Sequence, residues 1–88
     1  MSPQIAFTLR DRDLLLNLMT IEPDIAAKLR LAKFSKGSIL ITLNGDDLDV
    51  LLGAIAADAN HTKNKKLEKE LDGLYAHVDE FLQNHTDK

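Results

Sequence analysis

The clearest alternation of apolar and polar positions lies in the second half of the chain. From residue 46 to residue 59, apolar side chains recur at steps of three and four, the spacing of one face of a helix. These are Leu48, Leu51, Leu52, Ile55, Ala56 and Ala59. A second seam follows at Leu67, Leu71, Leu74, Val78 and Phe81, which Tyr75 and Leu82 widen. The two seams predict a C-terminal hairpin of two helices.

The gap between the seams predicts a turn around Asn60–Asn64. Asn60 suits a left-handed position at the end of the first helix, and Thr62 or Asn64 suits the cap of the second. No proline or glycine enforces this break, so one bent helix is the alternative.

The first half predicts a strand, two helices and a second strand. Ile5, Phe7 and Leu9 alternate as in a strand, and Thr8 or Asp11 then caps a helix through residues 14–19. Its inward face is predicted to contain Leu14, Leu15, Leu18 and Met19. Pro23 suits the first turn of the next helix, because proline lacks a backbone N–H. We expect residues 35–37 to end that helix, with Gly37 in a left-handed conformation.

Residues 38–43 predict the second strand, which is apolar on both faces. Either the fold covers both faces, or something outside the chain covers one. The fold class predicted is therefore mainly α (α+β), with the order β-α-α-β-α-α, two short strands that pair, and a single domain over residues 1–88.

Length and composition narrow the possibilities further. A domain of 88 residues has a thin core, and pairing with a second copy would stabilise it. The chain has no cysteine, which excludes disulfides, thiolate nucleophiles and cysteine-based zinc sites. No apolar run is long enough for a membrane span, and we find no secretion signal at the N-terminus, so we expect a cytoplasmic protein without membrane contact.

The back of the helix over residues 46–59 is apolar rather than charged. Val50, Ala54 and Ala57 form a second stripe of mostly small residues beside Gly53. Small residues allow another helix to approach closely. Either this helix is central in the fold, or the stripe is a contact between two copies in a homodimer.

The start of the last helix carries an unusual cluster of cations. Lys63, Lys65, Lys66 and Lys69 lie where the helix dipole is already positive, and His61 and Thr62 precede them. A site that binds phosphate or another anion would explain this placement. The alternative is a solvated turn whose lysines reach back to acidic residues.

The remaining chemistry favours a protein that is not an enzyme. Asp58 and His61 are three residues apart, but two ligands do not complete a metal site, so we expect no metal or other cofactor. No nucleophile elbow, phosphate loop or HExxH motif is present. The net charge of −3 argues against general nucleic-acid binding, although residues 1–43 carry +2 and residues 44–88 carry −5.

A helix-turn-helix is a further alternative for residues 14–36. The two helices around Pro23 have suitable lengths, and the second would carry Lys28, Arg30, Lys33 and Lys36. The turn lacks glycine, and the overall charge is adverse.

Residues 46–72 resemble a segment found in small uncharacterised bacterial proteins. The resemblance rests on Asp46-Asp47-Leu48, on Leu51-Leu52-Gly53, on the run from Ala56 to Leu67, and on Leu71-Asp72. It implies a bacterial origin and attaches no activity. The sequence therefore predicts a non-enzymatic interaction or regulatory module that acts through self-association. An unknown protein partner is also expected. The alternative is an accessory protein that binds nucleic acid or anions through residues 63–69.

Overall fold

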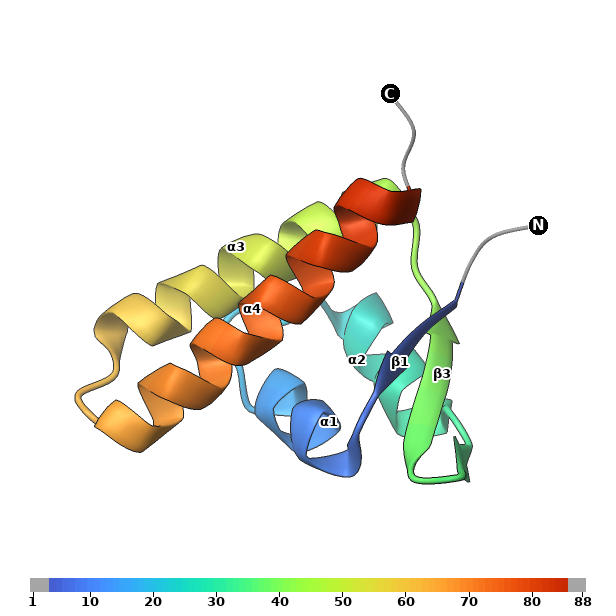
Figure 1. Cartoon of the computed structure of the whole chain (residues 1–88), viewed down its shortest axis with the longest axis horizontal. Helices are drawn as coiled ribbons and strands as arrows, with labels where there is room; N and C mark the ends of the chain where they lie inside the picture. The colour runs from blue at the N-terminus through green and yellow to red at the C-terminus, as the bar shows by residue number, and fades with distance from the viewer. Residues whose placement is uncertain (1–3, 86–88) are drawn as a thin grey trace.

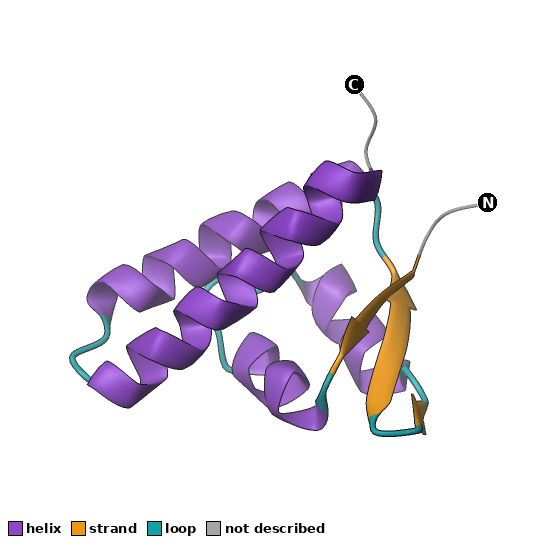
Figure 2. Cartoon of the chain, in the orientation of Figure 1, coloured by secondary structure: helices purple, strands orange, loops and turns teal. Residues whose placement is uncertain are grey.

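The computed structural model describes residues 4–85, which form four helices and a small sheet (Figure 1). The elements are β1 (Gln4–Phe7), α1 (Leu9–Leu16), α2 (Pro23–Leu31), β2 (Phe34–Ser35), β3 (Ser38–Thr42), α3 (Gly45–His61) and α4 (Lys65–His85). Figure 2 shows the sheet at one end of the molecule and the helices filling the rest. The mainly α fold class is confirmed, with one strand added to the predicted order.

The sheet has the order β1-β3-β2, with both pairings antiparallel. β1 pairs with β3 from Gln4 opposite Thr42 to Phe7 opposite Ile39, so the two predicted strands do pair. The two-residue strand β2 was not predicted. It exists because Lys36 and Gly37 both have positive φ, 55° and 87°, as a tight hairpin turn requires.

This hairpin corrects the expected end of the second helix. α2 ends at Leu31, and residues 35–37 form part of the β2–β3 hairpin instead of a helix terminus. Gly37 has the left-handed conformation that was predicted, but it serves a turn between strands.

Thr8, one of the two predicted caps, is confirmed as the N-cap of α1, but the helix ends before Met19. The Thr8 hydroxyl accepts from the Asp11 N–H, while the Asp11 carboxylate accepts from the Thr8 N–H, so this capping box starts the helix at Leu9. Leu14, Leu15 and Leu18 are buried as predicted. Met19 lies beyond the helix and is 81% exposed, so its predicted inward position is wrong.

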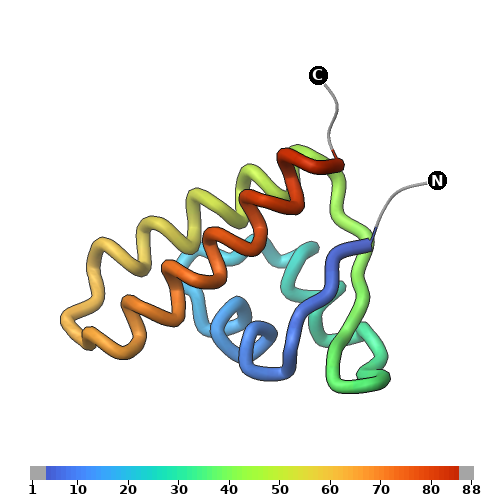
Figure 3. The backbone as a smooth tube through the Cα atoms, in the orientation of Figure 1, coloured from blue at the N-terminus to red at the C-terminus, as the bar shows by residue number. Residues whose placement is uncertain are grey.

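α3 and α4 form the predicted antiparallel hairpin, which runs along one side of the molecule (Figure 3). A second capping box, between Asn44 and Asp47, starts α3. The chain leaves helical geometry at residues 62–64, so the single bent helix is wrong. Asn60 remains helical, so its left-handed cap is also wrong, whereas Asn64 caps α4 as one of the two predicted candidates.

The core lies where the hairpin, the two shorter helices and one face of the sheet meet. Within residues 4–85 every fully buried side chain is apolar. The inward seams are confirmed at Leu48, Leu51, Leu52, Ile55, Ala59, Leu71, Leu74 and Val78, while Ala56, Leu67, Phe81 and Leu82 are partly buried. Tyr75, predicted to widen the seam, is exposed.

Candidate functional site

The outer face of α3 exposes most of the predicted small-residue stripe. Val50 is 41% exposed, Gly53 is exposed and Ala57 is half-buried. Ala54 instead faces the core and is buried. The accessible stripe, called the outer stripe below, therefore consists of Val50, Gly53 and Ala57.

Nothing else in the described chain packs against Gly53. A Cβ built on this residue would have no atom of another element within 4 Å. The same holds for Gly73 on α4. Packing inside residues 4–85 therefore gives no reason for glycine at position 53. Alanine would form a more stable helix at the same position.

The predicted anion-binding residues are divided between two hollows. His61 and Thr62 line one hollow with Met19 and Asp58. Lys65, Lys66 and Lys69 line another, together with Glu68 and Asp72. Lys63 lies in the turn between the helices, outside the lining of both.

The helix start beside these lysines already has an acceptor. The Asn64 side-chain oxygen accepts from the N–H groups of Lys66 and Leu67 at 3.0 and 3.1 Å. Lys65 also forms an ion pair with Glu68 at 3.9 Å. An anion at this position would compete with Asn64 for the free N–H groups that made the site attractive in the sequence.

The cations of the suggested helix-turn-helix do not share one helix. Lys28 and Arg30 lie on α2, but Lys33 follows it and Lys36 lies in the hairpin turn. Lys28 reaches the Asp47 carboxylate at 3.5 Å, so it links α2 to the first turn of α3. The second helix therefore lacks the row of cations that the sequence suggested.

Two long-range contacts hold α4 against the N-terminal half. Arg10 donates two hydrogen bonds to the Glu70 carboxylate, of 2.9 and 2.7 Å. This bonding, aided by the opposite charge of the guanidinium, lowers the pKa of Glu70. His77 Nε2 lies 2.7 Å from the Ala6 carbonyl oxygen and donates to it, and the ring contacts Phe7 edge-on at 5.6 Å.

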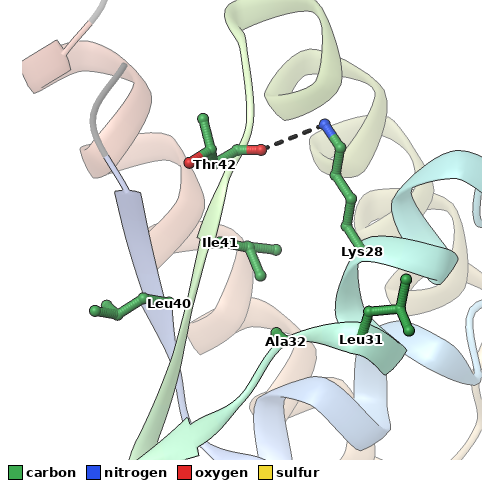
Figure 4. A pocket seen from close by; sticks show the side chains of 6 residues that line it. All are labelled: Lys28, Leu31, Ala32, Leu40, Ile41 and Thr42. Carbon is green, nitrogen blue, oxygen red and sulfur yellow. Dashed lines mark hydrogen bonds between the residues drawn. The ribbon is translucent and has the colours of Figure 1, made fainter. Parts of the chain in front are cut away.

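A groove between α2 and β3 was not anticipated from the sequence. It measures about 390 Å³ and is lined by Lys28, Leu31, Ala32, Leu40, Ile41 and Thr42 (Figure 4). The available signal was the apolar character of residues 38–43 on both faces. Leu40 indeed faces outward and is 54% exposed, whereas Ile41 is buried.

Residues 4–85 bring no three side chains of His, Cys, Asp or Glu together in a way that would hold a metal ion. In the same part of the chain, no helix combines the length and apolar character needed to cross a bilayer.

Comparisons of the chain with protein-family models, with curated proteins and with solved structures give no match. The resemblance of residues 46–72 to small bacterial proteins stays a prediction.

Proposed function

We propose that this protein is a small, non-enzymatic interaction module that associates with a second copy of itself through the outer stripe of α3. The observation that carries the proposal is Gly53. It lies in the middle of a 17-residue helix, at a position where the rest of the described chain leaves open space. A helix interior disfavours glycine, whereas a helix–helix contact that requires close approach of two backbones favours it.

The neighbours of Gly53 support this use. Val50 and Ala57 lie one turn to either side of it and are both apolar and accessible. Two copies meeting through this face would bury these side chains and cover part of a helix that the monomer leaves exposed. A small domain gains stability from such burial because its own core is thin.

Sedimentation equilibrium over a range of protein concentrations tests the proposal, with Val50→Asp as the perturbing variant. Val50 is 41% exposed, so the monomer should tolerate the aspartate. In the dimer the new carboxylate would be desolvated without a partner, and we expect association to be lost. Ala76→Asp is the matched control, because it adds the same charge to an exposed position of α4.

A strict monomer at the highest concentrations would contradict the proposal. Equal weakening of association by Val50→Asp and Ala76→Asp would also contradict it, because the effect would then follow net charge and not the outer stripe.

Anion or nucleic-acid binding at the lysine cluster is the second candidate function. It is supported by the hollow in which Lys65, Lys66 and Lys69 lie together. Binding of a nucleic acid measured by gel shift at low salt tests it, with Lys65→Glu/Lys66→Glu as the variant. Unchanged binding by this variant would rule out the cluster as the site.

A further inference from the structure

β1 is an edge strand of the sheet. The strand order is β1-β3-β2, so within residues 4–85 β1 has a strand neighbour on its β3 side only. Backbone groups on an unpaired edge can bind a strand of another chain, and folded proteins often cover such an edge with a helix or a loop. The elements beside β1 therefore decide whether the sheet can add a further strand.

The outward side of β1 presents the backbone groups of Gln4 and Ala6. In an antiparallel strand, the N–H and C=O of one residue point to the same side, and successive residues alternate. The Ala6 carbonyl oxygen is bound by His77 of α4, which lies outside the sheet. Two residues earlier, Gln4 pairs with Thr42, whose carbonyl oxygen turns to Lys28 at 3.4 Å and away from β1 (Figure 4). Both contacts place the backbone groups of Gln4 and Ala6 on the side of β1 that faces away from β3.

His77 holds the Ala6 carbonyl oxygen from α4. Its Nε2 donates to this oxygen over 2.7 Å. The imidazole ring also contacts Phe7 edge-on, with the ring centroids 5.6 Å apart and an angle of 80° between the planes. Phe7 is 1% exposed, so the core fixes the ring against which His77 rests. α4 therefore places a side-chain donor on the acceptor that an added strand would need.

Two copies of β1 could pair with each other if this acceptor were free. An antiparallel pair with its twofold axis at Ile5 places Gln4 of each copy opposite Ala6 of the other. Both residues have outward backbone groups, so this register pairs the donors and acceptors of both chains. The edge is self-complementary, which makes a second copy the occupant that it fits. Pairing requires the Ala6 carbonyl oxygen of each copy, and His77 already binds it.

We propose that His77 guards the β1 edge and prevents a second copy from adding its own β1 to the sheet. It occupies the Ala6 carbonyl oxygen, so pairing must first break one hydrogen bond in each copy. The contact is autoinhibitory toward strand addition and leaves association through the outer stripe of α3 unaffected. The β1 edge is separate from the outer stripe, so the inference goes beyond the function proposed above and does not depend on it.

His77→Ala in a Val50→Asp background tests the proposal. Val50→Asp removes association through the outer stripe, so the background protein is expected to be a monomer. Sedimentation equilibrium should then show dimers of the double variant at concentrations at which the background is monomeric. We expect the association constant to rise by up to about a hundredfold, because pairing no longer breaks one hydrogen bond in each of two copies and one such bond corresponds to at most roughly tenfold.

His77→Gln and His85→Ala are the matched controls in the same background. Glutamine keeps an N–H donor at a similar reach from the backbone, so it should hold the Ala6 carbonyl oxygen and stay monomeric. His85→Ala removes an exposed imidazole from the same helix, where its ring contacts Phe81 and not the sheet, so it should also stay monomeric. Only loss of the donor at the β1 edge separates His77→Ala from these two variants.

Ala6→Pro identifies the surface that the His77→Ala dimer uses. It removes an outward N–H from an edge strand, a place where proline is tolerated, and it should return the protein to a monomer. In the dimer without this proline, NMR on a mixture of labelled and unlabelled protein should place Gln4 of one copy beside Ala6 of the other.

A His77→Ala variant that is as monomeric as the Val50→Asp background would overturn the proposal. Dimers of His77→Ala that persist with Ala6→Pro, or that lack the contact between Gln4 and Ala6, would overturn it too. If His77→Ala does not fold, His77→Leu decides by the same outcomes, because leucine keeps an apolar contact with Phe7 but has no donor. Failure of the parent protein to associate through the outer stripe leaves all of these comparisons unchanged, so the two proposals fail separately.

Discussion

Gly53→Ala is expected to stabilise the monomer. Gly53 lies in the middle of α3, its φ is not positive, and a Cβ added there meets no atom of another element within 4 Å. Alanine is favoured over glycine in a helix interior by about 1 kcal/mol, largely because glycine loses more backbone entropy on folding. For a domain of this size, about 1 kcal/mol corresponds to a rise in Tm of roughly 4–8 °C.

Gly73→Ala provides the matched control. Gly73 lies inside α4, is also exposed, and has the same open space around a built Cβ. The two substitutions therefore have the same expected effect on the monomer, about 1 kcal/mol each. Urea unfolding followed by circular dichroism at the lowest usable protein concentration measures both.

Repeating the comparison at high protein concentration separates monomer packing from self-association. If two copies of α3 approach closely at Gly53, the added methyl group separates them, and the stabilisation by Gly53→Ala should shrink or reverse while that by Gly73→Ala persists. Equal gains for both variants at every concentration would refute a close helix contact at Gly53. Destabilisation by Gly53→Ala at the lowest concentration would refute the open space around it in the monomer.

Three further substitutions test the core, a helix cap and a long-range ion pair. Ile55→Ala should cost about 2–5 kcal/mol in urea unfolding because Ile55 is fully buried, and a cost no greater than that of Val50→Ala would contradict its place in the core. Thr8→Ala should cost about 1 kcal/mol by removing the side chain that caps α1, and an unchanged midpoint would show that the cap does not stabilise the fold. Arg10→Gln should raise the pKa of Glu70 in an NMR titration, because the guanidinium holds it low. The stabilisation by this ion pair should be complete above the unfolded pKa of glutamate and disappear as pH falls through the lower folded value, so a pH profile unchanged by Arg10→Gln would contradict the linkage.

Local sequence patterns predicted most of the helical framework. The steps of three and four in residues 48–78 fix one face of each hairpin helix, and most positions on those faces are buried. The strand around Ile5 and the strand around Ile39 were recognisable by alternation and by β-branched residues. These features depend on neighbours within a few positions, which a sequence displays directly.

The errors lie where a local signal had two meanings. The residues Lys36 and Gly37 marked a turn correctly, but the same residues can end a helix or join two strands, and only the pairing of Phe34 with Ile39 decides between them. Met19 continued an apolar stripe in the sequence, yet the helix ends at Leu16 and leaves it in solvent.

The candidate surfaces were also predictable only in part from the sequence. The outer stripe of α3 was recognisable because Val50, Gly53 and Ala57 follow a helical period. Which of its residues are accessible could not be predicted, because Ala54 is buried by neighbours that lie elsewhere in the chain. The groove at β3 was hinted at only by the apolar outward position of Leu40.

The sequence by itself determined the four helices, the two longer strands and which of their faces are apolar, because those properties arise from side-chain spacing and backbone preference. Tertiary structure alone decided the contacts between Arg10 and Glu70, 60 positions apart, and between Ala6 and His77, 71 positions apart. It also decided that α4 meets the outer edge of β1 and that α2 forms a groove with β3. The physical reason is that such contacts and grooves depend on which distant elements pack beside each other, and the packing of distant elements leaves no periodic trace in the chain.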